Sequence, residues 1–171
     1  MNPVFVMVDM QEKFLPVIAD IDTIIKNSDI LIQASKILNI PLISTEQYPK
    51  GLGPTIDSLS QPDPIEKVEF SCFGSEKFSK KIQDIKPTSL ILFGIETHVC
   101  ILQTALEALK KGIKTYVIAD ATSSRTKENK RLALDHLRHK GANIYSTEML
   151  LFQLLKKAGT EEFKEISKLI K

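Results

Sequence analysis

A cysteine lies at an expected junction between a strand and a helix, and its thiol is the side chain best suited to nucleophilic chemistry. Residues 90–93 form an apolar run that indicates a buried strand, and residues 94–100, Gly-Ile-Glu-Thr-His-Val-Cys, follow it directly. A cysteine in the first turn of a helix lies near free backbone N–H groups and the positive end of the helix dipole, which favour a thiolate. Cys100 is therefore a candidate nucleophile. A buried structural thiol is the alternative that its position leaves open.

Two charged residues far apart in the sequence are expected to lie at the ends of other strands. Asp9 ends the apolar run at residues 4–8, and Lys67 lies near the end of a shorter run at residues 64–68. In a parallel sheet, ligands bind beyond the carboxyl ends of the strands. A carboxylate, an ammonium group and the Cys100 thiol are thus expected at one edge of the sheet, although Asp9 could instead cap a turn and Lys67 could be a surface charge.

The elements that must position these side chains alternate regularly between strand and helix. Continuous apolar runs predict six strands, at residues 4–8, 41–45, 64–68, 90–93, 115–119 and 143–146. Apolar residues at helical spacing predict helices at residues 21–38, 78–85, 102–109, 127–140, 150–155 and 161–170. The alternation predicts a single α/β domain over residues 1–171: a doubly wound, mainly parallel sheet with helices on both faces. Residues 48–62, rich in Gly and Pro, are expected to form an unusually long loop.

Composition excludes several classes of protein. A formal net charge of +2 without a long basic stripe argues against a nucleic-acid binder. No segment reaches the ~20 apolar residues needed to cross a bilayer. Charged residues, beginning with Asp9, interrupt the early apolar run, so no signal peptide is expected. The two cysteines, Cys72 and Cys100, form neither a disulfide framework nor a metal-binding CxxC pattern. We expect a reduced, cytoplasmic protein whose partner is a small-molecule substrate.

Several short motifs occur together in the order and spacing of a known superfamily. They are Val8-Asp9-Met10-Gln11 with Phe14, Lys67, the segment from Gly94 to Cys100 with Gln103-Thr104-Ala105, and Asp120-Ala121 with Ser123-Ser124-Arg125. Over essentially its full length, the chain resembles the isochorismatase-like cysteine hydrolase superfamily. Residues 96–100 and 163–166 most resemble the group called isochorismatase domain-containing proteins.

The resemblance implies a six-stranded parallel sheet and a catalytic triad of Asp9, Lys67 and Cys100. In that triad Asp9 would take the thiol proton, while Lys67 would keep Asp9 ionised and favour the thiolate. Attack on a carbonyl would give a thioester that water hydrolyses. The resemblance also implies a cis peptide bond between Ile95 and Glu96, so that the backbone N–H groups of Glu96 and Cys100 form the oxyanion hole.

The sequence differs from two branches of the superfamily, and these differences limit the class of substrate that we expect. Enzymes that cleave isochorismate itself typically lack the cysteine, so Cys100 favours amide or imide hydrolysis. Nicotinamidases usually carry an Asp-x-His metal motif, whereas residues 44–48 read Ser-Thr-Glu-Gln-Tyr, and the three histidines have no matching spacing. The leading hypothesis is a cofactor-free, metal-independent cysteine hydrolase that acts on a small carboxamide or related C–N bond through a Cys thioester. A catalytically silent scaffold that retains the pocket is the alternative, and redox sensing through Cys72 and Cys100 ranks last.

Roles are also expected for residues around the triad. The candidate substrate-pocket residues are Phe14, Gln47, Tyr48, Phe73 and His98, although an aromatic residue is more often part of the core. Thr97 is expected to cap the helix through its hydroxyl, and the Glu96 side chain could point to solvent. The group from Asp120 to Arg125 is interpreted as structural or interface-forming, with Asp120 supporting its loop. Homo-oligomerisation is expected from the resemblance and from the apolar C-terminal helices.

Overall fold

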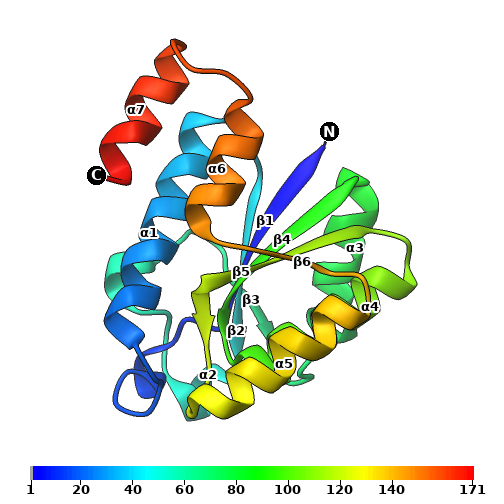
Figure 1. The fold of residues 1–171 in the computed structure, drawn as a ribbon. Coiled ribbons are helices and arrows are strands. Elements are labelled where there is room, and N and C mark those ends of the chain that lie inside the picture. The colour runs from blue at the N-terminus through cyan, green and yellow to red at the C-terminus, as the bar shows by residue number, and fades with distance from the viewer. Residues whose placement is uncertain (1) are drawn as a thin grey trace.

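A six-stranded, entirely parallel sheet forms the centre of the computed structural model, which describes residues 2–171 (Figure 1). The strands lie in the order β3-β2-β1-β4-β5-β6. Their bounds are β1 Pro3–Val8, β2 Leu42–Gln47, β3 Ile65–Lys67, β4 Ser89–Ile95, β5 Lys114–Ser123 and β6 Asn143–Tyr145. The order reverses between β1 and β4, so ligands are expected beyond the carboxyl ends of these two strands. The predicted α/β class is confirmed.

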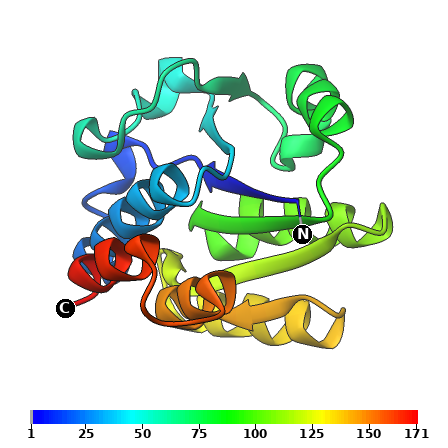
Figure 2. The same cartoon turned by 90° about the horizontal axis from the view of Figure 1, so that it is seen from above.

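Helices cover both faces of the sheet. Their bounds are α1 Ile21–Ile37, α2 Pro49–Leu52, α3 Glu76–Ile85, α4 Leu102–Lys110, α5 Lys127–His139, α6 Thr147–Leu155 and α7 Glu161–Leu169. Figure 1 shows α3, α4 and α5 on one face, with α1 and α6 on the other. Helix α7 packs on α1 and α6 rather than on the sheet, as the view from above shows (Figure 2).

The alternation of side chains along β1 explains why the core has two layers. Val4 and Val6 point to one face of the sheet and pack with α3, α4 and α5, whereas Phe5 and Met7 point to the other and pack with α1 and α6. All six residues of β1 are buried, as expected for a central strand covered on both sides.

The junction between β1 and β4 requires glycine at position 94. Gly94 lies opposite Val8 in the parallel register and has a φ of +113°, which L side chains rarely adopt. A Cβ atom there would overlap the Val8 carbonyl oxygen. The two strands can therefore approach closely at the edge where the candidate residues Asp9 and Cys100 emerge.

The two largest differences between predicted and observed boundaries arise because polar residues with distant partners look like loop residues in the sequence. Strand β5 was expected to end at residue 119 but continues to Ser123, where the Thr122 hydroxyl donates to the Gly94 carbonyl oxygen at 2.7 Å. Helix α6 begins at Thr147 instead of residue 150, because Ser146 and the Asp120 carboxylate accept hydrogen bonds from its first turn. The expected loop at residues 48–62 contains α2 and a 3-10 turn at Asp57–Leu59.

Candidate active site

A buried ion pair joins the ends of β1 and β3. Asp9 follows β1 directly, and Lys67 is the last residue of β3. The Lys67 Nζ lies 2.8 Å from the Asp9 Oδ2, and neither side chain is exposed to solvent. A charge pair in this environment is screened little by water or salt.

The Lys67 ammonium group is surrounded by further acceptors. It donates to the Gln47 Oε1 at 2.6 Å and to the backbone carbonyl oxygens of Glu69 and Phe70, each at 3.2 Å. The Cys100 Sγ lies 3.7 Å from the same Nζ. The carboxylate, the ammonium group and the thiol expected from the sequence therefore meet in one cluster.

The second oxygen of Asp9 is also bound. The hydroxyl of Thr45, a buried residue of β2, donates to the Asp9 Oδ1 at 2.7 Å. The carboxylate is thus held from both sides, by Thr45 and by Lys67. Sequence reasoning missed Thr45, although it stands near the end of a strand, the same signal that selected Asp9 and Lys67.

Cys100 lies on a single π turn, Thr97–Ile101, that precedes α4. The Glu96 carbonyl oxygen anchors this turn by accepting from the backbone N–H groups of Val99 at 3.1 Å and Ile101 at 3.2 Å. Only 5% of Cys100 is exposed. The peptide bond between Ile95 and Glu96 is cis, as the resemblance implied.

The electrostatics of the site differ from the expectation of a thiolate. Burial and the nearby Asp9 carboxylate raise the pKa of the Cys100 thiol, and the Lys67 charge offsets this only in part. Burial alone would lower the pKa of Lys67, but the negative charge of Asp9, together with the two cysteines, raises it above its ordinary value. Burial and Asp9 therefore oppose the thiolate form of Cys100, while Asp9 favours the charged form of Lys67.

Two of the predicted pocket residues, Phe73 and Phe14, pack against the core clusters. Phe73 is buried and stacks edge-on against Phe78 with ring centroids 5.2 Å apart, while Phe14 packs against the core cluster on the opposite face of the sheet. Apolar side chains near a site are commonly claimed by the core because burial stabilises them. Cys72 is also buried, which raises its pKa to about 11, and its backbone N–H donates to the Thr104 hydroxyl.

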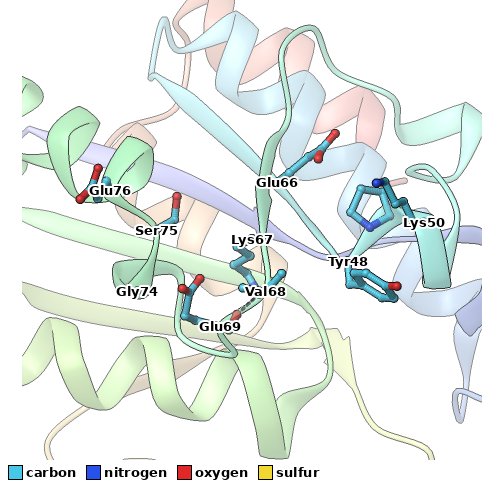
Figure 3. Close-up of a pocket in the computed structure, with 10 residues that line it drawn as sticks. Tyr48, Lys50, Glu66, Lys67, Val68, Glu69, Gly74, Ser75 and Glu76 are labelled. Atoms are coloured by element: carbon cyan, nitrogen blue, oxygen red, sulfur yellow. Dashed lines mark hydrogen bonds between the residues drawn. The ribbon is translucent and has the colours of Figure 1, made fainter.

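A cavity of about 660 Å³ lies beside β3, and Lys67 is the member of the cluster that lines it. Residues 48–50, 66–69 and 74–76 line it, so Tyr48 and Lys67 are the predicted site residues on its wall (Figure 3). Gln47, also predicted for the pocket, binds Lys67 with its Oε1 and donates to the Val68 carbonyl oxygen with its Nε2 at 2.7 Å.

The Glu96 side chain does not point freely to solvent. Its carboxylate lies 3.0 Å from the Arg125 Nε and 3.3 Å from the His98 Nδ1, and the His98 Nδ1 is also 2.9 Å from the Ser124 hydroxyl. Thr97 does not cap the turn; its hydroxyl pairs with that of Thr122 at 2.9 Å. These contacts attach the π turn to the end of β5.

Comparison with known proteins agrees with this arrangement. The model of the isochorismatase domain matches residues 3–149. The chain is 42% identical over 170 residues to isochorismatase domain-containing protein 2 of Danio rerio, with 98% of this chain and 86% of that protein covered. The chain belongs to the isochorismatase family.

Two solved structures share the fold of this isochorismatase-family chain. One, described as the MAR1 ribonuclease from Caenorhabditis elegans, has a TM-score of 0.92 and 37% identity and covers 99% of this chain and 89% of its own. The other, the YcaC gene product of Escherichia coli, described as an octameric hydrolase of unknown specificity, has a TM-score of 0.90 at 22% identity and covers 98% and 87%. The chain thus has the isochorismatase-like hydrolase fold.

Two further features of this isochorismatase-family chain concern metals and membranes. Among residues 2–171, no three or more His, Cys, Asp and Glu side chains are grouped so that they could hold a metal ion. None of the helices in the same range is both long and apolar enough to cross a membrane.

Proposed function

We propose that the chain is a metal-independent cysteine hydrolase that needs no cofactor and cleaves a small carboxamide or related C–N bond. The observation that carries the proposal is the contact of Lys67 with both Asp9, at 2.8 Å, and Cys100, at 3.7 Å. A nucleophile, a carboxylate base and a cation within hydrogen-bonding range are the groups that acyl transfer requires.

Proton transfer accompanies attack in this mechanism, because the resting thiol has a raised pKa. As the Cys100 sulfur bonds to the substrate carbonyl carbon, its proton passes to the Asp9 carboxylate, and Lys67 stabilises the new thiolate character. The tetrahedral intermediate then collapses, the C–N bond breaks, and the leaving amine takes the proton from Asp9. Water, deprotonated by Asp9, then attacks the thioester; the C–S bond breaks, the acid is released, and the leaving sulfur takes the proton back from Asp9 to restore the thiol.

Backbone N–H groups would stabilise the oxyanion formed in both steps. The proposed donors are the N–H groups of Glu96, which immediately precedes the π turn, and of Cys100, which lies within it. Loss of one such donor typically lowers kcat by 10²–10³. Tyr48 on the cavity wall and His98 in the π turn are proposed to contact the substrate.

One observation favours the second candidate, a catalytically silent scaffold that retains the pocket. Cys100 is 5% exposed, and its pKa is raised, as expected for a structural thiol. The two candidates differ in whether Asp9 is needed for the reactivity of the thiol.

A panel of small amides, read out by acid release and by mass-spectrometric capture of an acyl group on Cys100, separates the two candidates. We expect turnover in the native protein and in Cys72→Ala, and none in Cys100→Ala or Asp9→Asn. Turnover that survives Cys100→Ala would refute the cysteine mechanism, and an unmodified Cys100 across the panel and a metabolite extract would favour the scaffold.

Partners and location belong to the same proposal. We propose that the protein is cytoplasmic and forms a homo-oligomer. The apolar side chains of Met149 and Phe152 on α6, which are 53% and 44% exposed, support the oligomer. Nucleic acid is not proposed as a substrate, although the Caenorhabditis elegans relative is described as a ribonuclease. Incubation with single-stranded and duplex RNA tests that exclusion, and cleavage that Cys100→Ala abolishes would overturn it.

A further inference from the structure

A fully buried glutamine outside the triad is bound to the backbone of the residue that holds Lys67. Gln11 follows β1 and has no exposed surface. Its Oε1 accepts from the Gln47 N–H at 2.7 Å, and its Nε2 donates to the Gln47 carbonyl oxygen at 3.0 Å. The Gln11 side chain thus pairs with position 47 as a neighbouring strand would.

The same amide also fastens the segment that follows β2. The Gln11 Nε2 donates to the Gly53 carbonyl oxygen at 2.8 Å, and the Gln11 backbone forms an isolated bridge with Thr55. The amide nitrogen and oxygen of one side chain therefore make three hydrogen bonds to backbone groups of residues 47 and 53. Buried amides satisfied in this way hold their partners in one geometry.

Gln47 transmits this geometry to the reacting groups. Its backbone is fixed by Gln11, and its Oε1 accepts from the Lys67 Nζ at 2.6 Å, the shortest hydrogen bond of that ammonium group. Lys67 in turn contacts Asp9 and Cys100. The path from Gln11 to the thiol runs through consecutive hydrogen bonds with no gap.

We propose that Gln11 is a positioning residue that acts through Gln47 to hold the Lys67 ammonium group between Asp9 and Cys100. This inference rests on the proposed function, since it concerns the same three reacting groups. A purely structural role, in which Gln11 only fastens residues 47–55, predicts a loss of stability without an effect that depends on the Gln47 side chain.

Alkylation of Cys100 by iodoacetamide tests the coupling without a known substrate. The rate is followed on the Cys100 peptide by mass spectrometry, below the unfolding temperature of every variant. We expect Gln47→Met to slow the reaction about tenfold and Gln11→Met about three- to tenfold, from the loss of hydrogen bonds to a charged group or to its holder. The double variant should react at the same rate as Gln47→Met alone, because Gln11 acts on Lys67 only through the Gln47 side chain, which both variants lack.

A matched control and a reserve variant keep the result interpretable. Gln33→Met removes a side-chain hydrogen bond to Asp29 on α1, away from the cluster, and should react like the native protein. If Gln11→Met does not fold, Gln11→Asn, whose amide is one methylene short, replaces it. Unchanged alkylation in the Gln11 variant, or additive effects in the double variant, would overturn the coupling alone. If Asp9→Asn also leaves the rate unchanged, the proposed function falls with it.

Discussion

Replacing Lys67 by methionine tests how strongly the buried ion pair is coupled to the fold. The substitution keeps an unbranched side chain of similar length but removes the charge 2.8 Å from the Asp9 carboxylate. Asp9 would then keep the Thr45 hydroxyl as its side-chain partner. Both side chains of the pair are 0% exposed, so water cannot replace the lost ammonium group without a rearrangement.

Breaking a buried pair in this way costs about 3–5 kcal/mol. A domain of this size shifts its Tm by about 2–4 °C per kcal/mol, so we expect a decrease of roughly 6–20 °C. Because the folded pKa of Lys67 is raised, its contribution is fully present below the unfolded value of about 10.4 and is lost as pH rises through the folded pKa. The effect should therefore be complete at pH 7 and shrink only in alkali.

Urea unfolding at pH 7, at fixed protein concentration, measures this loss. The matched control is Lys77→Met, which breaks a 3.0 Å pair with Asp63 whose side chains are 56% and 73% exposed and which should leave stability unchanged. Asp9→Asn combined with Lys67→Met should cost much less than the sum of the single variants. A Lys67→Met variant as stable as Lys77→Met, or a double variant with additive costs, would show that the pair is not a coupled unit.

Two further predictions use matched glycines and the second cysteine. Gly94→Ala should strongly reduce the free energy of unfolding, measured in urea, because the alanine Cβ would overlap the Val8 backbone. The control Gly112→Ala, at φ +75° with no atom within 4 Å, should reduce that free energy by only about 1 kcal/mol. Equal losses would contradict the close approach of β1 and β4 at Gly94. Cys72, whose pKa is raised to about 11 by burial, should resist a maleimide in the folded protein at pH 7 and become labelled only in urea, and rapid labelling without denaturant would contradict its placement in the core.

Strands in the centre of the sheet were predictable because burial on both faces leaves a continuous apolar run. Strands β1 and β4 show this pattern, with every residue buried. The second half of β5 was not predictable, since Asp120, Thr122 and Ser123 read as loop residues. Each of these polar side chains has a partner in a distant segment, as the bond from Thr122 to the Gly94 carbonyl oxygen illustrates. Hydrogen bonds to residues far along the chain leave no local periodicity.

The candidate site was likewise only partly predictable: residues at strand ends could be predicted from the sequence, but contacts between residues far apart in the chain could not. The cluster of Asp9, Lys67 and Cys100 follows from their places in the strand order, whereas the role of Gln11 depends on backbone groups that lie 36 and 42 residues later. The state of the thiol depends on opposing effects. Lys67 favours a thiolate, but burial and the Asp9 charge outweigh it.

That balance has a mechanistic consequence. In the proposed mechanism, the Asp9 carboxylate accepts the thiol proton as the sulfur attacks. The net charge of Asp9, Lys67 and Cys100 would then stay constant through the transfer, so the proposed reaction would create no unpaired buried charge. A carboxylate fixed on one oxygen by Thr45 and on the other by Lys67 is suited to this exchange because it need not move while its charge is neutralised.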